Sequence, residues 1–329
     1  MTAFRFSSLV VESGNRGYTR LSVGRLADGS ELSLPLHVVH GATAGPTMLL
    51  VGVVHGEEIF AVDAIRSALN AIDPRALRGT LMAVPVANPP ALAWQSRNGP
   101  VDSLDLNRQF PGSGDGWLSE RIAARLSELV DRSDCLVHID GGTTDRVIHY
   151  TFVKTAAGEV GGEGERLSRA FGMKYLYRGP QAKGSLTSYA AERGLPCVLA
   201  EIGGGTLFGD PTYLKRASDG VLRVMAALDM VSAPKAEVGE QHLLTRRTLV
   251  RIPEGGIFHP SLGVDALDRE LPKDTLLGAV LDPYTLEYVA EIRTPYQRSV
   301  LLQMRVLPRA VQPGDYAFII ADADSTVST

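Results

Sequence analysis

The stretch TMLLVGVVHGEE, residues 47–58, carries the pattern that decides the fold. Residues 47–54 form a continuous apolar run of strand length, which is typical of a parallel sheet covered on both faces. A helical period follows at once, because apolar side chains recur three or four residues apart at Ile59, Val62, Ile65 and Leu69. Residues 80–87 form another apolar run, so this region predicts a strand, a helix and a second strand.

The alternation of strands and helices continues along the chain. Further patterns predict helices and strands in the order 118–129, 134–140, 146–153, 185–193, 196–202 and 211–230. Before this region, residues 1–40 alternate polar and apolar side chains around the turn Ala27-Asp28-Gly29-Ser30, which predicts a β-hairpin or an edge meander. The sequence therefore predicts an α/β fold with a mixed, largely parallel sheet and helices on both faces.

The C-terminal part has a different pattern. After about residue 245 the helical period disappears, and short β-like runs separated by Gly, Pro and Asp turns continue to Asp322. We therefore expect a smaller all-β domain over residues 241–329, after an α/β domain over residues 1–240. The polar segment 232–239 is the expected connection between them.

Composition restricts the partners that the chain can have. Its 329 residues include 33 Lys and Arg against 37 Asp and Glu, for a formal net charge of -4, with no basic cluster. This balance favours a small-molecule partner over nucleic acid or an anionic membrane. No apolar run is long enough for a membrane helix or a signal peptide, so we expect a cytoplasmic protein. Cys135 and Cys197 lie in apolar β-like runs and are expected to be buried thiols.

The most informative polar residues are His55 and Glu58, which follow the apolar strand 47–54 directly. Ligands bind at the carboxyl ends of strands in open α/β sheets, and the intervening Gly56 permits a sharp turn. A catalytic zinc ion typically takes three His, Glu or Asp ligands. Alone, however, this pair is more often a structural histidine followed by a carboxylate near a helix N-terminus.

Two further polar groups add to this pattern. Asn107 and Arg108, within DLNRQFPG at 105–112, place an amide beside a guanidinium, which suits a carboxylate substrate, and Arg97 adds a second cation. Loop arginines alone are mostly solvated. Glu201 lies at the end of the apolar strand 196–202, just before three glycines. A carboxylate at the end of a buried strand is unfavourable for packing but well placed to act as a general base.

Together these motifs resemble a known family. The HGEE segment after a strand, Arg97 followed by the Asn107-Arg108 pair, the segment DCLVHIDGG and the segment EIGGG are similar to the succinylglutamate desuccinylase and aspartoacylase family, which is related to the zinc carboxypeptidases. The resemblance covers most of residues 45–210, and the C-terminal β segment also resembles the β domain of that family. It implies a zinc-carboxypeptidase-like catalytic domain with a β domain that caps the cleft.

The resemblance also implies roles for individual residues. His55 and Glu58 would be ligands of one Zn²⁺ per chain, and Glu201 would be the general base that activates the metal-bound water. Arg97 would polarise the scissile carbonyl, while Asn107 and Arg108 would bind the substrate carboxylate.

The third metal ligand departs from the family pattern. The family usually has Asp-Leu-His there, whereas the register of residues 134–142 places His138 at the Asp position and Asp140 at the His position. The two side chains share a strand face but lie roughly 6 to 7 Å apart. We therefore favour Asp140 as the third ligand, with His138 as the alternative ligand or as a neighbouring contact. A His, Glu and Asp set is harder than usual, which would also admit manganese, cobalt or iron.

Three functions are consistent with this pattern. The first is a metal-dependent amidohydrolase that deacylates a small anionic N-acyl amino acid or related amide by attack of a metal-bound water. The alternatives are a zinc carboxypeptidase-type exopeptidase and a non-catalytic binding protein with a degenerate metal site. A homo-oligomer is expected because such assemblies are common. His149, near Thr143 and Arg146, and Tyr284 are further candidates for the pocket.

Overall fold

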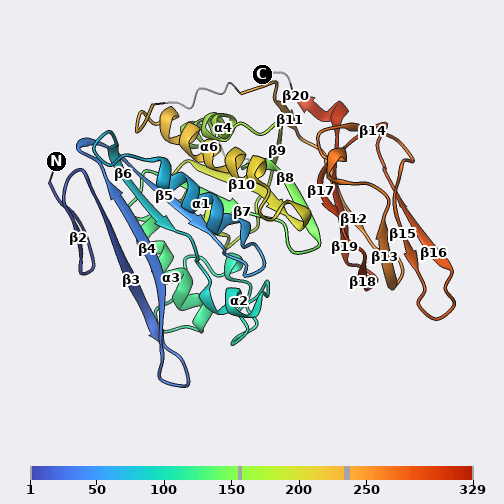
Figure 1. The fold of residues 1–329 in the computed structure, drawn as a ribbon, viewed down its shortest axis with the longest axis horizontal. Helices are drawn as coiled ribbons and strands as arrows, with labels where there is room; N and C mark the ends of the chain where they lie inside the picture. Colours follow the sequence, from blue (N-terminus) through green and yellow to red (C-terminus); the bar gives the residue numbers. More distant parts are fainter. Residues whose placement is uncertain (1, 155–157, 233–237, 328–329) are drawn as a thin grey trace.

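The fold is built on one large mixed sheet. The computed structural model describes residues 2–154, 158–232 and 238–327, and its main sheet has 14 strands (Figure 1). Four neighbouring strands form a parallel core, in the order β10 (Cys197–Gly204), β7 (Cys135–Asp140), β5 (Thr43–Gly52) and β6 (Arg78–Val84). The carboxyl ends of β5, β7 and β10 consequently lie side by side.

Antiparallel strands extend this core on both sides. Beyond β6 the sheet continues through β4 (Glu31–His40) and β3 (Asn15–Arg25), which form the predicted hairpin. Beyond β10 it continues through β8 (Arg146–Lys154), which is antiparallel to β10 and parallel to β9 (Tyr175–Gly179). Strands β1 (Phe4–Phe6) and β2 (Leu9–Val11) form a separate pair.

Helices cover both faces of the sheet, so the predicted fold class is confirmed. One face packs against α1 (Phe60–Ala71), α4 (Gly158–Phe171) and α6 (Pro211–Ala227). The other packs against α3 (Leu118–Val130) and α5 (Leu186–Glu192), and the short α2 (Pro89–Trp94) follows β6. Alternate residues of β7 serve the two cores: Val137 and Ile139 face the α1 side, and Leu136 faces the α3 side.

The sequence did not predict α4 and β9. The sequence of α4, GEVGGEGERLSRAF, contains four glycines, and its buried residues are Leu167, Ser168 and Phe171 near its C-terminal end. Its apolar period is therefore too short to stand out, and glycine is a poor helix former in the interior of a helix. Packing of this short apolar end against the sheet and α6 explains why the helix forms.

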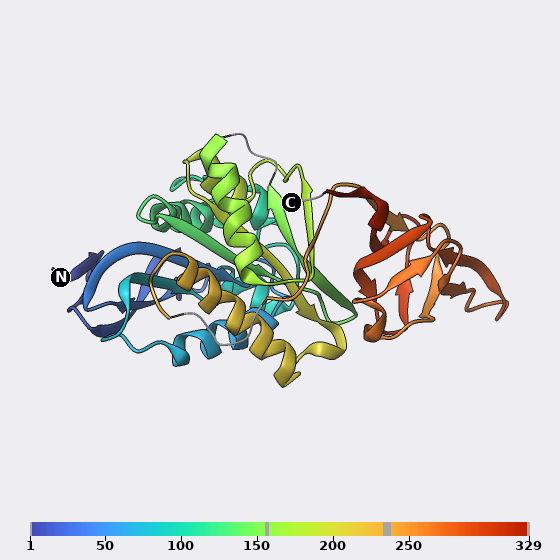
Figure 2. The same ribbon diagram turned by 90° about the horizontal axis from the view of Figure 1, so that it is seen from above.

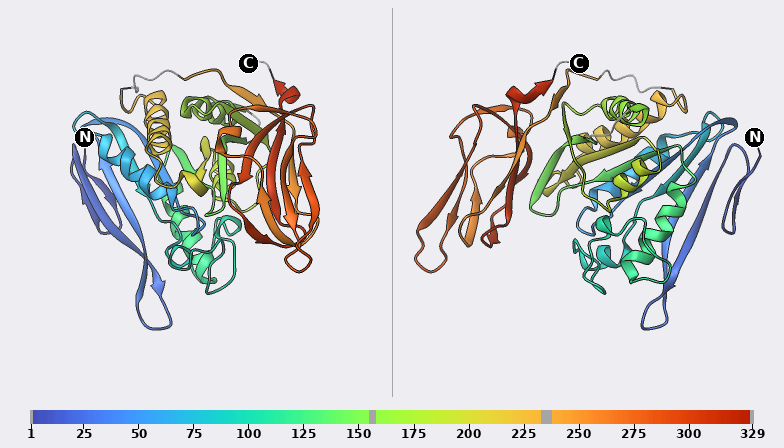
Figure 3. Two further views of the ribbon diagram at one scale, coloured as in Figure 1. Left: turned by 45° about the vertical axis from the view of Figure 1, so that its right-hand side comes forward. Right: turned by 180° about the vertical axis from the view of Figure 1, so that it is seen from behind.

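The C-terminal part is all β, as expected. Its strands are β11 (His242–Leu244), β12 (Arg247–Arg251), β13 (Gly256–Pro260), β14 (Glu270–Pro272), β15 (Leu276–Leu281), β16 (Tyr288–Arg293), β17 (Arg298–Arg305), β18 (Arg309–Val311), β19 (Tyr316–Asp322) and β20 (Thr326–Val327). Strand β11 pairs with β9 and with β20, whereas the other strands gather at the opposite end of the molecule from the N-terminal strands (Figures 2 and 3). Most of the predicted connection, at residues 233–237, lies outside the described residues.

This C-terminal part joins the main sheet directly. Strand β17 pairs with β8, so that β17, β19 and β12 continue the 14-stranded sheet, while β16, β15, β13 and β18 form a second sheet. Between β7 and β8, the buried Asp145 carboxylate accepts hydrogen bonds from Arg305 and Arg309, and its carbonyl accepts one from the Val306 N–H. Backbone and charged contacts together fix β17 against the α/β part.

Two other expectations concern the chain as a whole. Among the described residues, no helix is long and apolar enough to cross a membrane. Both cysteines are free thiols; Cys135 is buried, whereas Cys197 is only partly buried, which differs from the expectation for that residue.

Candidate active site

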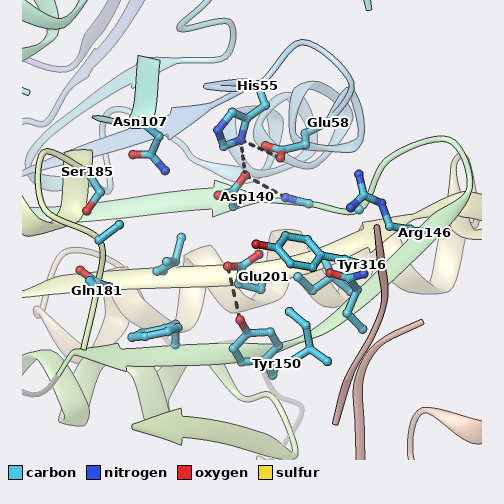
Figure 4. A pocket seen from close by; sticks show the side chains of 18 of the residues that line it. His55, Glu58, Asn107, Asp140, Arg146, Tyr150, Gln181, Ser185, Glu201 and Tyr316 are labelled. Carbon is cyan, nitrogen blue, oxygen red and sulfur yellow. Dashed lines mark hydrogen bonds and ion pairs between the residues drawn. The ribbon is translucent and has the colours of Figure 1, made fainter. Parts of the chain in front are cut away.

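A cavity of about 420 Å³ lies at the carboxyl ends of β5, β7 and β10. Its walls come from both parts of the chain. In Figure 4, Glu201 lies in the middle, with His55, Glu58 and Asp140 on one side of it and with Tyr150 on the opposite side. The volume lies within the range of small-molecule sites. The cavity is lined by seven of the residues predicted from sequence, whereas His138, His149 and Tyr284 do not line it; the seven are His55, Glu58, Arg97, Asn107, Arg108, Asp140 and Glu201.

The loop between β5 and α1 positions His55 and Glu58. Val53, just after β5, has a φ of 50°, an uncommon conformation for a β-branched residue, and it turns the chain sharply. At Gly56, a Cβ atom would lie 2.0 Å from the Ala91 carbonyl oxygen, so only glycine fits. The turn brings His55 Nδ1 to 2.8 Å from Glu58 Oε1.

Asp140, the last residue of β7, completes a cluster with these two side chains. Its Oδ1 lies 3.5 Å from His55 Nδ1, and one ligand atom from each residue lies within 4.8 Å of the others. All three residues are buried, and Glu58 Oε2 has no hydrogen-bond partner among the described residues. An unpaired buried carboxylate oxygen and three converging donors fit a divalent metal ion.

The charges in the cluster also fit a cation. Burial and the neighbouring Asp140 carboxylate raise the pKa of Glu58 well above its usual value. Burial alone would lower the pKa of His55, but the carboxylates of Glu58, Asp105 and Asp140 raise it well above its ordinary value. These shifts show that the carboxylates favour a positive charge beside them, which a protonated His55 supplies in the absence of a metal. A divalent ion would supply that positive charge.

Asp105 orients the outer nitrogen of His55. Its Oδ1 lies 3.1 Å from His55 Nε2, and its Oδ2 accepts a hydrogen bond of 3.0 Å from Arg97 Nη2. Burial alone would raise the pKa of Asp105, but the contacts with His55 and Arg97 hold it well below its usual range. A carboxylate on the far nitrogen of a ligand histidine fixes the ring and leaves Nδ1 free for a metal. Asp105 belongs to the motif DLNRQFPG, but its local sequence does not indicate the contact with His55.

His138 lies outside the cluster. It is wholly buried two residues before Asp140, opposite Val51 and Leu199 in the sheet. Neither of its ring nitrogens has a hydrogen-bond partner within the part of the chain that the structure describes. Burial lowers its pKa, which favours the neutral form of the ring. The structure therefore brings Asp140, and not His138, together with His55 and Glu58.

Glu201 lies on β10, between Asp140 and Tyr150. In the register of the sheet it is opposite Asp140 on β7 and Tyr150 on β8. The Tyr150 hydroxyl donates to Glu201 Oε1 at 3.5 Å, and Arg247 Nη1 donates to the Tyr150 oxygen at 2.8 Å. Burial and the charge of Asp140 raise the pKa of Glu201 to about 8. A carboxylate with a raised pKa is well suited to proton transfer near neutral pH.

Asn107 and Arg108 lie in the short helical turn η1 (Leu106–Arg108). Asn107 Oδ1 accepts a hydrogen bond of 2.9 Å from the backbone N–H of Leu186, and none of the described residues accepts one from its amide hydrogens. Arg108 Nη1 donates to the Asn107 carbonyl at 2.7 Å and forms no ion pair with any described residue. Both side chains line the cavity with donors for an anion.

The C-terminal part contributes residues that the sequence did not indicate. The cavity is lined there by Arg247, Leu249, Gln303, Tyr316 and Ile319. Tyr284 was expected to reach the cleft, which is wrong, because it is 95% exposed at the turn between β15 and β16 and does not line the cavity.

The prediction that His149 belongs to the pocket is also wrong. It lies on the other face of β8, where Nδ1 is 2.6 Å from the Tyr213 hydroxyl and Nε2 is 3.1 Å from Asp268 Oδ1. Thr143 and Arg146, which precede it, do line the cavity. Side chains alternate along a strand, so the neighbours Ile148 and Tyr150 point into the cavity and His149 does not.

The fold and this cluster define an α/β protein with a candidate metal centre at the ends of parallel strands. A family model described as the succinylglutamate desuccinylase/aspartoacylase catalytic domain matches residues 44–228, more than half of the chain. The chain therefore belongs to this family, as the sequence motifs predicted.

Individual relatives agree with this assignment. The N-alpha-acetyl-L-2,4-diaminobutyric acid deacetylase of Halomonas elongata is 27% identical over 292 residues, which cover 84% of this chain and 82% of the relative. An aspartoacylase family protein from Mesorhizobium loti has a TM-score of 0.79 and 25% identity, covering 95% of this chain and 96% of its own. The ectoine utilization protein EutE (DoeB) from Ruegeria pomeroyi shares the fold, with a TM-score of 0.82 and 24% identity over 94% of this chain and 95% of its own.

Proposed function

We propose that the protein is a metal-dependent amidohydrolase that deacylates a small N-acyl amino acid or a related amide. The observation that carries the proposal is the placement of Glu201 directly opposite Asp140, in the cavity that His55 and Glu58 also line. Asn107 and Arg108, which we call the anion-binding pair, line the same cavity. The name of the Halomonas elongata relative, a deacetylase of an N-acetyl amino acid, supports this reaction class.

Three side chains would hold one metal ion: His55 through Nδ1, Glu58 and Asp140. We propose zinc, although a donor set with two carboxylates also suits manganese, cobalt or iron. When bound, such an ion polarises the scissile carbonyl and lowers the pKa of a water molecule.

The residues of the chain have separate tasks in this reaction. Asn107 and Arg108 bind the substrate carboxylate and so place the scissile amide near Glu201. Arg97, held by Asp105, donates to the carbonyl oxygen as negative charge develops there. Glu201 takes a proton from the attacking water and returns it to the leaving nitrogen.

We further propose that residues 1–240 form the catalytic domain and that residues 241–329 form a β domain that caps the cleft. The C-terminal residues that line the cavity support this division. A cap of this kind favours small substrates over protein chains.

Two other functions compete with this proposal. An exopeptidase is favoured by the Asn107-Arg108 pair, which would bind a peptide C-terminus as well as an amino-acid carboxylate. A non-catalytic binding protein would need neither Glu201 at this position nor the unpaired oxygen of Glu58.

A substrate panel separates these functions. The protein, purified without chelator and analysed for bound metal, is incubated with N-acetyl amino acids and with dipeptides of the same residues. We expect about one metal ion per chain and hydrolysis of the acyl amino acids. Release of C-terminal residues with inert acyl amino acids would establish an exopeptidase, and absence of both metal and turnover would favour the binding protein.

A further inference from the structure

A row of four residues crosses the cavity floor beyond Glu201. Ile148 on β8 is opposite Gln303 on β17, which is opposite Ile319 on β19, which in turn is opposite Leu249 on β12. All four line the cavity. We call them the Gln303 row. Three of the four belong to the C-terminal part of the chain.

The Gln303 row lies on the side of Glu201 away from the anion-binding pair. In Figure 4, Asn107 lies on one side of Glu201, and Arg146 lies on the other. Ile148 follows Arg146 by two residues on β8 and precedes Tyr150, the partner of Glu201, by two. The row is therefore displaced from Glu201 toward Arg146 by two residues, or about 7 Å along the strands.

The amide of Gln303 has no partner within the described ranges. Gln303 is only 7% exposed, and its Nε2 atom is buried without a hydrogen bond. Its neighbours in the row, Ile148 and Ile319, are apolar, so they offer no acceptor. Buried polar groups in proteins are nearly always paired, and an unpaired one is destabilising. A ligand oxygen or an ordered water in the cavity would supply the missing partner of Gln303.

The order of groups along the cavity sets the direction of the substrate. Under the proposed function, on which this inference rests, the carboxylate lies at Arg108 and the scissile carbonyl lies near Glu201. The acyl group then points toward the Gln303 row. An acetyl group has only one carbon beyond its carbonyl, so it ends short of Gln303, which lies two residues along and two strands across from Glu201.

We propose that the Gln303 row is an acyl subsite, and that the substrate carries an acyl chain longer than acetyl with an oxygen that accepts a hydrogen bond from Gln303. Ile148, Ile319 and Leu249 contact the methylene groups of that chain, and Gln303 distinguishes an oxygen from a methylene. The C-terminal part of the chain therefore selects the acyl group.

The test compares acyl groups on one amino acid. The metal-loaded protein is assayed with the N-acetyl, N-pentanoyl and N-(4-oxopentanoyl) derivatives of the amino acid whose acetyl derivative is cleaved fastest. We expect kcat/KM to rise in that order, with about a tenfold preference for 4-oxopentanoyl over pentanoyl. Gln303→Leu should bring this ratio to about one. Gln312→Leu, at an exposed glutamine in the turn before β19, is the matched control and should retain the preference.

A binding experiment keeps the inference separate from the proposed function. Glu201→Gln, in which the proposed base is removed, is titrated with N-pentanoylglycine and N-(4-oxopentanoyl)glycine by calorimetry, with and without the Gln303→Leu change. Tighter binding of the oxo compound, lost with Gln303→Leu, supports the subsite even if no N-acyl amino acid is hydrolysed. Hydrolysis of acetyl substrates with equal binding of both glycines would overturn the subsite and leave the deacylase proposal intact.

Discussion

Asp140 and Glu201 lie directly opposite each other on the neighbouring parallel strands β7 and β10. Adjacent strands are about 4.8 Å apart, so a candidate metal ligand and a candidate general base face the same small volume. Neither residue needs a long loop to reach the other. The pairing also keeps the two roles separable, because Glu201 is not part of the His55, Glu58 and Asp140 cluster.

Glu201→Gln should therefore keep the metal and lose turnover. The amide has nearly the shape of the carboxylate but cannot accept the proton, so we expect kcat to fall by about 10²- to 10⁴-fold with metal content unchanged. Steady-state kinetics and metal analysis of the same sample check this result. Normal turnover in the variant would show that Glu201 is not the base.

Asp140 and His138 should differ sharply in their effect on metal content. Asp140→Asn removes a charged donor from the cluster, and we expect the variant to lose stoichiometric metal after dialysis. His138→Leu replaces a buried ring, to which no described residue forms a hydrogen bond, by an apolar side chain, and we expect metal to be retained. The reverse pattern in metal analysis would make His138 the third ligand.

Much of this site follows from local sequence. His55, Glu58 and Glu201 each stand next to an apolar strand, and the two-residue period of β7 separates Asp140 from His138. The parallel core could be predicted because its strands and helices alternate with clear periods. The weak apolar period of α4 hid that helix, which forms through its contacts with the sheet.

Other parts of the site depend on pairing between distant segments. Gln303 enters the cavity only because β17 pairs with β8, and Arg247 reaches Tyr150 only because β12 follows β19 in the same sheet. No local pattern near these two residues specifies that register. Tyr284 was chosen from its local sequence, which does not show how the strands around it pair, and it lies on an exposed turn.

Asp105→Asn should weaken metal binding without removing a ligand. The amide can turn its oxygen toward His55 Nε2, but it lacks the charge that fixes the ring and pairs with Arg97. We expect about a 10- to 100-fold loss of metal affinity, measured by competition with a chromophoric chelator. Asp102→Asn, which lies nearby but contacts Ser119, serves as the control. Equal affinities in both variants would argue against the role of Asp105.

The raised pKa of Glu201 predicts a pH dependence of stability in metal-free protein. Burial and Asp140 raise this pKa from 4.5 to about 8, so the folded state binds the proton more tightly than the unfolded chain does. The resulting stabilisation is complete below about pH 4.5 and is lost as pH rises through about 8. Glu201→Gln does not titrate, so its Tm relative to the wild type should rise between pH 5 and pH 8 and level off above that range. Thermal melts in EDTA test this, and a pH-independent difference in Tm would contradict it.

Asp145 should be essential for joining the two parts of the chain. It is buried and pairs with the buried guanidinium of Arg305 and with Arg309, so Asp145→Asn leaves a buried cation without its charged partner. We expect the free energy of unfolding in urea to fall by about 3 to 5 kcal/mol. Asp265→Asn removes the exposed pair with Arg269 and should change it by less than about 1 kcal/mol. Adding Arg305→Met to Asp145→Asn should recover much of the loss, because it removes the stranded charge; failure to recover would indicate that the Asp145 carboxylate acts mainly through its other contacts.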